Sequence, residues 1–127
     1  MAGIYLLTVM QEFSAAHEVR GHPGKCARMH GHNWKVAIEV AATTLNNIGI
    51  GLDFYDMKQA LAELIDTLDH QNLNMIPPFD TINPTAENLA AWFYQQLSRQ
   101  IKSSTYKIAS VQIWETDRCS VRYSEND

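Results

Sequence analysis

The sequence predicts an α+β domain in which an antiparallel four-stranded sheet carries two helices on one face. Strand and helix patterns follow in the order strand, strand, helix, helix, strand, strand, which differs from the strict alternation that builds a parallel sheet. A length of 127 residues fits one domain, and 46% hydrophobic with 19% charged residues is typical of a folded chain. We therefore expect one domain over residues 1–127.

Two strands are expected before the helices. From Tyr5 to Ala15 the odd positions are mostly apolar, and His17 continues this parity. The second strand alternates from Trp34 to Val40, and its apolar face extends backwards onto His32 and His30. Residues 18–29 contain glycine and proline and are expected to form the connecting loop.

Two amphipathic helices are expected in the middle of the chain. Asp53 is a suitable N-cap for the first, which should end near Asp69 and His70. Thr85 can cap the second, directly after Pro84. The apolar positions recur at helical spacing, and they are Met57, Leu61, Leu64, Ile65 and Leu68 in the first helix and Leu89, Trp92, Phe93, Leu97 and Ile101 in the second.

Two further strands are expected at the end of the chain. Ala109, Val111 and Ile113 form an apolar face in the first, and Glu115 continues its parity. After a turn, Cys119 begins an alternation that predicts a strand with this cysteine in the core. A four-stranded sheet leaves open edges, so we expect a homo-oligomer.

Composition excludes several classes of function. The net charge of -4 argues against binding nucleic acid through a broad basic face. The apolar stretches are too short to cross a membrane, and no basic segment opens a secretory signal, so we expect a cytoplasmic protein. Two cysteines do not make a disulfide framework, so each is expected to be a free thiol.

The histidines suggest a metal site. His30 and His32 leave one face of a strand, and His17 has the same inward parity in its neighbour. Three imidazoles suit zinc and leave a fourth tetrahedral position open, as in catalytic zinc sites. The alternative is a group of hydrogen-bonded histidines at the end of a strand.

Cys26 lies in the loop between two basic residues, Lys25 and Arg28, which favour a thiolate. It is a candidate base or nucleophile, and the alternatives are a fourth zinc ligand or a loop cysteine without a role. Asp69 can orient His70 for proton transfer, although neighbours on a helix diverge and the two residues could instead form a capping or surface pair.

Glu115 is unusual because a carboxylate on a buried strand face costs several kcal/mol unless donors pair with it. A ligand with adjacent N–H groups could supply those donors. The alternative is that the strand ends at Ile113 and Glu115 turns into solvent.

Five segments together resemble the 6-pyruvoyltetrahydropterin synthase family, over about Phe13 to Thr116. They are Phe13-Ser14-Ala15-Ala16-His17, Cys26-Ala27-Arg28-Met29-His30-Gly31-His32, Leu68-Asp69-His70, Asn83-Pro84-Thr85-Ala86-Glu87-Asn88 and Trp114-Glu115-Thr116. The three residues between Cys26 and His30 are similar to the 6-carboxytetrahydropterin synthase branch.

The resemblance implies a T-fold, in which subunits assemble into a barrel as a trimer or as a hexamer of two trimers. It also implies that His17, His30 and His32 bind one zinc ion and that Cys26 is the proton acceptor. Asp69 and His70 would complete the triad from a neighbouring subunit. Glu115, with Thr116, would bind the pterin.

The implied activity is that of a zinc-dependent lyase in queuosine biosynthesis. Its substrate would be 7,8-dihydroneopterin triphosphate, and its products 6-carboxy-5,6,7,8-tetrahydropterin, acetaldehyde and triphosphate. Alternatives are a 6-pyruvoyltetrahydropterin synthase and a non-catalytic zinc- or pterin-binding protein of the same fold. Basic residues of the loop, namely Arg20, His22, Lys25 and Arg28, could supply positive charge for the triphosphate.

Overall fold

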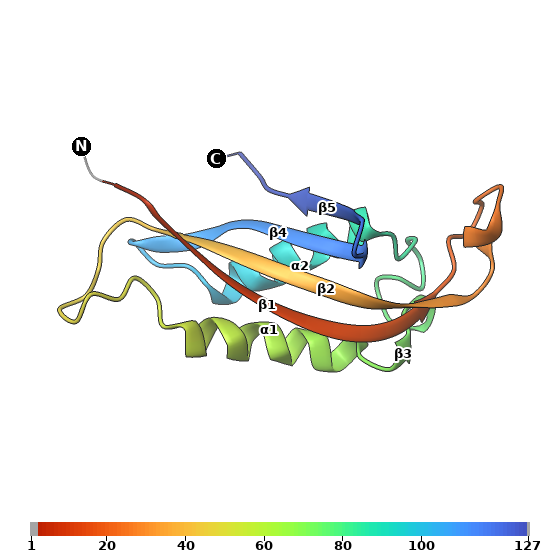
Figure 1. Ribbon diagram of the computed structural model, residues 1–127, viewed down its shortest axis with the longest axis horizontal. Coiled ribbons are helices and arrows are strands. Elements are labelled where there is room, and N and C mark those ends of the chain that lie inside the picture. Colours follow the sequence, from red (N-terminus) through yellow and green to blue (C-terminus); the bar gives the residue numbers. More distant parts are fainter. Residues whose placement is uncertain (1–2, 127) are drawn as a thin grey trace.

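The computed structural model describes residues 3–126 as one twisted sheet with two helices on one side (Figure 1). The strands are β1 (Tyr5–His17), β2 (His30–Ala42), β3 (Gln71–Asn72), β4 (Tyr106–Thr116) and β5 (Cys119–Tyr123). The α-helices are α1 (Phe54–Leu68) and α2 (Ala86–Gln100), and the short 3-10 turns are η1 (Lys25–Ala27) and η2 (Leu73–Met75). The predicted α+β class with two helices is confirmed.

The sheet has the strand order β3-β1-β2-β4-β5, so it contains five strands and the predicted count of four is wrong. The additional strand is the two-residue β3, which pairs with β1 in parallel through Ala15 and Ala16. A segment this short carries no alternation pattern. The four longer strands pair antiparallel, as expected.

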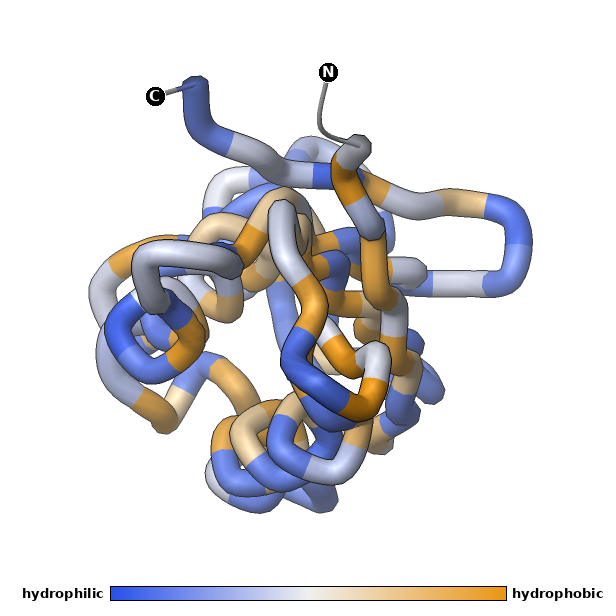
Figure 2. Tube along the Cα trace, turned by 90° about the vertical axis from the view of Figure 1, so that its left-hand side faces the viewer, coloured by the Kyte–Doolittle hydropathy of each residue, from blue (hydrophilic) through white to orange (hydrophobic). Residues whose placement is uncertain are grey.

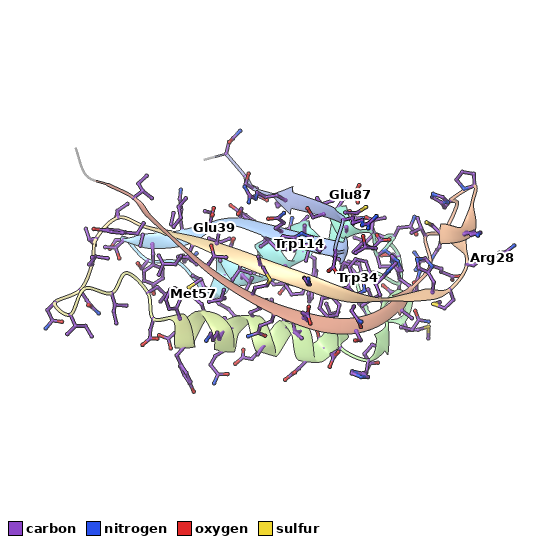
Figure 3. The ribbon with its side chains drawn as sticks, in the orientation of Figure 1. Arg28, Trp34, Glu39, Met57, Glu87 and Trp114 are labelled. Carbon is purple, nitrogen blue, oxygen red and sulfur yellow. The ribbon has the colours of Figure 1, made fainter. Side chains whose placement is uncertain are left out.

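Both helices begin at the predicted caps. The Asp53 carboxylate accepts a hydrogen bond from the Tyr55 amide, and the Thr85 hydroxyl accepts one from the Asn88 amide. The predicted helix stripes face the core, with Leu64 and Trp92 only half-buried. Met57 points from α1 toward the sheet, and Trp34 lies nearer the other end of the core between the sheet and the helices (Figure 3).

A β-bulge overturns the predicted inward face at Ala109. Glu39 pairs with Ser110 while Val40 pairs with Ile108, so Ala109 has no partner in the ladder. Ile108 and Ser110 are therefore buried and Ala109 is only half-buried. From Val111 onward the parity is the predicted one, and it places Glu115 on the same face as Ile113.

The helices do not cover the first residues of β1. Tyr5 is 50% exposed and Leu7 is half-buried, so the predicted inward position of Tyr5 is wrong, whereas Val9, Phe13 and Ala15 are buried.

In the end-on view of Figure 2, hydrophobic and hydrophilic stretches alternate along the chain. Neither helix within residues 3–126 has the length and apolar character needed to span a bilayer.

Candidate functional site

Three histidines converge where β1 and β2 meet the loop of residues 18–29. His17 is paired directly with His30 in the antiparallel register, and His32 follows two residues later on the same face. The ligand atoms of these histidines and of Glu115 all lie within 4.8 Å of one another. The predicted convergence of the three imidazoles is therefore present in the fold.

Backbone carbonyl groups orient two of the rings. His17 Nδ1 lies 2.7 Å from the Pro84 oxygen, and His30 Nδ1 lies 2.7 Å from the Arg28 oxygen. A carbonyl only accepts hydrogen bonds, so in each neutral ring the proton belongs on Nδ1 and the lone pair on Nε2. The two Nε2 atoms are 3.1 Å apart, and a cation bound by both would remove the repulsion between their lone pairs.

His32 presents a buried nitrogen without a hydrogen bond. Its Nε2 atom lies 3.1 Å from Glu115 Oε1, yet it makes no hydrogen bond within the described residues. A buried unpaired polar atom costs about 1–3 kcal/mol, which a bound ion would offset. Three converging imidazole nitrogens are a suitable donor set for a zinc ion with an open fourth position, so His17, His30 and His32 fit the metal that the sequence predicts.

Burial favours the neutral form of two of the rings. Burial lowers the pKa of His17 and of His32, and the Glu115 carboxylate opposes this shift at both rings. His17 is only 1% exposed. Because the neutral imidazole is the form that binds a metal ion, burial prepares both histidines for binding at neutral pH.

Trp34 lies against two of the histidines on the side of the core. It is fully buried, and its ring centre is 4.9 Å from that of His17 and 5.3 Å from that of His32, both in edge-on contact. Its indole N–H donates to the Ala15 carbonyl at 3.3 Å. This packing restricts the rotation of both imidazoles.

An open pocket of about 400 Å³ lies beside the cluster. Its lining consists of Lys25, Cys26, Arg28, His30, His32 and Glu115. Cys26 is a half-buried free thiol in η1, and its carbonyl accepts from the Val19 amide at 2.7 Å. Its sulfur is not among the four converging ligand atoms. Arg28 projects at the same end of the molecule (Figure 3).

Glu115 belongs to β4, which continues to Thr116, so the alternative in which the strand stops at Ile113 is wrong. The Glu115 side chain is 31% exposed and faces His32. Thr116 is exposed, and its hydroxyl accepts from the Arg118 amide at 3.3 Å.

Asp69 and His70 form a contacting pair. The Asp69 carboxylate accepts from the Ser14 amide at 2.9 Å, and its second oxygen lies 3.0 Å from His70 Nδ1. The two side chains do not diverge as neighbours on a helix would, because α1 ends at Leu68 and His70 has a φ of 58°. Two hydrogen bonds lower the pKa of Asp69, and the bond from the Ser14 amide has a larger effect than the bond with His70.

The exposed ring of His70 borders a different pocket from Cys26. Its side chain is 81% exposed and lines an open pocket of about 560 Å³. Other residues of that pocket include Ser14, Gly31 and Asn33, and Cys26 is not one of them. In the described chain, the pocket that His70 lines and the pocket that Cys26 lines are therefore separate, and His32 borders both.

Three further residues that the sequence singled out, namely Cys119, Arg20 and His22, do not line the pocket beside the histidines. Cys119 is exposed at the start of β5, so its predicted place in the core is wrong; on this edge strand only Val121 and Tyr123 pack against the core. The guanidinium of Arg20 donates to the Phe79 carbonyl at 2.6 Å, and His22 accepts from the Gly24 amide at 2.9 Å. Neither Arg20 nor His22 lines the pocket beside the histidines.

Sequence reasoning missed the carbonyl partner of His17. Pro84 is far from His17 along the chain, and a backbone oxygen has no side-chain signal. The available clue was Pro84 itself, which stands directly before the helix cap Thr85 and so has a fixed backbone position.

The chain is also similar to known proteins. The model of the 6-pyruvoyl tetrahydropterin synthase family matches residues 6–126. A Synechocystis protein named 6-carboxy-5,6,7,8-tetrahydropterin synthase is 34% identical, over 87% of this chain and 86% of its own length. A Dictyostelium discoideum protein named 6-pyruvoyl tetrahydrobiopterin synthase is 30% identical, over 97% of this chain and 98% of its own.

The fold has a solved counterpart as well. The structure of Caenorhabditis elegans 6-pyruvoyl tetrahydropterin synthase superposes with a TM-score of 0.85 at 24% identity, covering 98% of both chains. This likeness confirms the predicted T-fold architecture. The family match over nearly the whole sequence and the two relatives establish that the chain belongs to the 6-pyruvoyl tetrahydropterin synthase family.

Proposed function

We propose that this chain is a zinc-dependent 6-carboxy-5,6,7,8-tetrahydropterin synthase. It converts 7,8-dihydroneopterin triphosphate into 6-carboxy-5,6,7,8-tetrahydropterin, acetaldehyde and triphosphate, a step toward queuosine. The names of the relatives support a pterin synthase of the lyase type. The observation that carries the proposal is the convergence of His17, His30 and His32 beside the pocket that contains Cys26 and Glu115.

His17, His30 and His32 would hold the zinc ion. When bound, zinc supplies Lewis acidity toward the hydroxyl groups of the substrate side chain and makes the neighbouring carbon-bound protons easier to remove. The carbonyl groups of Pro84 and Arg28 fix two of the rings in the required orientation.

Cys26 would accept the proton at its sulfur. It borders the same pocket as His30 and His32, so a substrate side chain in that pocket can reach both the thiol and the histidine end. Lys25 and Arg28 line the pocket as well, so two positive charges lie beside the place where the substrate would bind. The pair Asp69 and His70 would assist the proton transfer from a neighbouring subunit.

A neighbouring subunit suits the exposure of His70, whose ring lies at the surface and outside the pocket of Cys26. β5 and the two-residue β3 are the outer strands of the sheet and leave backbone groups available for pairing. We propose a trimer, or a hexamer of two trimers, in which such contacts complete the sites.

Glu115 would anchor the pterin. Its carboxylate lies in the pocket and accepts hydrogen bonds only, which suits the amino and ring N–H groups of a pterin. Thr116 follows at the end of β4 with an exposed hydroxyl that can contact the same ligand.

A 6-pyruvoyltetrahydropterin synthase is the second candidate, and the extensive match to the Dictyostelium relative favours it. The three residues between Cys26 and His30 favour the carboxy product. A non-catalytic binding protein of this fold would have no need for Cys26, Asp69 and His70 together.

The experiment that separates these candidates is incubation of the zinc-loaded protein with 7,8-dihydroneopterin triphosphate, followed by mass identification of the products. The proposal predicts 6-carboxytetrahydropterin with acetaldehyde. Formation of 6-pyruvoyltetrahydropterin would support the second candidate, and unchanged substrate would support the binding protein.

A further inference from the structure

Two asparagines hold the chain that leaves β1 immediately after the metal ligand His17. The Asn74 side chain accepts from the Glu18 amide at 2.9 Å and donates to the Glu18 carbonyl at 3.0 Å. The Asn83 side chain binds the backbone of Arg20 in the same way: it accepts from the Arg20 amide and donates to the Arg20 carbonyl, both at 2.9 Å. Each side-chain amide thus replaces the partner strand that Glu18 and Arg20 lack.

The second asparagine also fixes the residue before Pro84. The backbone carbonyl of Asn83 accepts from the side chain of Asn88 at 2.9 Å. The backbone amide of Asn88 donates to the Thr85 hydroxyl at 3.1 Å. Asn88 therefore bonds to the residue on each side of Pro84. The proline ring restricts the remaining backbone freedom, so the Pro84 carbonyl is held from both directions.

That carbonyl is the 2.7 Å partner of His17 Nδ1. We propose that Asn83 and Asn88 are positioning residues for the metal ligand His17, acting through the Pro84 carbonyl. They fix the ring so that Nδ1 carries the proton and Nε2 faces His30 and His32. The inference rests on the metal centre of the proposed function, but not on which pterin product is formed.

The expected effect is on metal affinity. Loss of a group that orients a metal ligand typically weakens binding about 10–100-fold. Asn88 is the better residue to change, because Asn83 also holds Arg20 directly. Asn88→Ala removes the donor to the Asn83 carbonyl and leaves every proposed zinc ligand in place.

The test measures the affinity of the metal-free full-length protein for Zn²⁺ by competition with a chromophoric chelator at neutral pH. We expect Asn88→Ala to bind Zn²⁺ about 10–100-fold more weakly than the unsubstituted chain. Asn46→Ala is the matched control, because Asn46 accepts from the Ile48 and Ile50 amides in a loop outside the site. That control should lose stability without losing affinity.

A second variant distinguishes positioning from loss of helix stability. Asn88→Asp keeps the size of the side chain but places a carboxylate oxygen against the Asn83 carbonyl. A negative charge in the first turn of α2 favours the helix. We therefore expect this variant to weaken Zn²⁺ binding although α2 is not destabilised, which a purely structural role of Asn88 would not produce. It also serves if Asn88→Ala fails to fold.

A double-mutant cycle with His17→Ala tests the route of the effect. If Asn88 acts through His17, then Asn88→Ala should change Zn²⁺ affinity little once His17 is absent. An equal loss in both backgrounds would overturn the inference, as would a foldable Asn88 variant with unchanged affinity. Absence of Zn²⁺ binding by the unsubstituted chain would instead overturn the metal centre on which the inference depends.

Discussion

His17 Nε2 lies 3.1 Å from His30 Nε2, while the other nitrogen of each ring already faces a backbone carbonyl. Two neutral histidines oriented in this way direct lone pairs toward each other. His32 adds a third nitrogen that is buried without a hydrogen bond. A cation shared by the three rings would remove this repulsion and would give His32 Nε2 a partner.

Cys26→Ala should abolish most product formation while the fold and the zinc content are kept. Removal of a general base typically lowers the rate about 10²–10⁴-fold, and the Cys26 sulfur is not among the converging ligand atoms. Initial rates with 7,8-dihydroneopterin triphosphate and metal analysis check both parts. Cys119→Ala is the control, and we expect it to be active because this exposed thiol lies outside the pocket. Loss of zinc from Cys26→Ala would show that the thiol is a ligand.

Mixed oligomers should reveal whether the triad forms between subunits. Cys26→Ala and His70→Ala are each expected to be inactive alone. If the two are unfolded together and refolded as a mixture, some sites will combine an intact Cys26 with an intact His70 from another chain, and activity should return. A mixture as inactive as its components would place both residues of a working site in one chain.

Glu115→Gln should weaken pterin binding. The substitution keeps the shape and replaces one acceptor by a donor, so a charge-assisted hydrogen bond of about 1.5–3 kcal/mol is lost. Titration with a pterin ligand measures the change, and zinc content should stay the same. Because Glu115 Oε1 is only 3.1 Å from His32 Nε2, loss of zinc would identify the carboxylate as a fourth ligand instead.

The stability of the metal-free protein should fall as the pH drops below 6.5. Burial holds the pKa of His17 and His32 below the ordinary value of 6.5 in the folded state. Below 6.5 the unfolded chain takes up these protons first, so unfolding becomes easier until the lower folded-state pKa values are reached. Well above pH 6.5 both histidines are neutral in the folded and in the unfolded chain, so they do not lower the free energy of unfolding there.

Urea unfolding of the metal-free chain between about pH 7.5 and about pH 5.5 checks this prediction. His17→Gln should show a shallower decline, because one of the two imidazoles with a lowered pKa is gone. An equal slope in both proteins would mean that His17 does not contribute to the pH dependence.

Much of the site could be predicted because strand alternation is a local property. The parity of residues from Tyr5 and from Trp34 was enough to bring His17, His30 and His32 to one face, and the fold confirms it. Alternation failed at Ala109, where a bulge inserts an unpaired residue, and at Cys119, where the right parity lies on an edge strand that packs little.

The remaining features depend on contacts between distant segments. The Asp69–His70 contact requires the left-handed backbone of His70 and the amide of Ser14, neither of which has a sequence signal here. The bonds between Arg20 and Asn83 and between His17 and Pro84 join residues more than sixty positions apart, and only the proline offered a clue in the sequence. Side-chain patterns do not encode backbone partners at such separations.

The most direct test of the metal centre is the zinc content of the purified protein and of His30→Ala, measured by elemental analysis after equilibration with Zn²⁺. The convergence of His17, His30 and His32 predicts about one zinc ion per chain in the unsubstituted protein and a large loss in the variant. His22→Ala is the control, because His22 lies outside the cluster. A His30→Ala protein that retains as much zinc as the unsubstituted chain would contradict the assigned site.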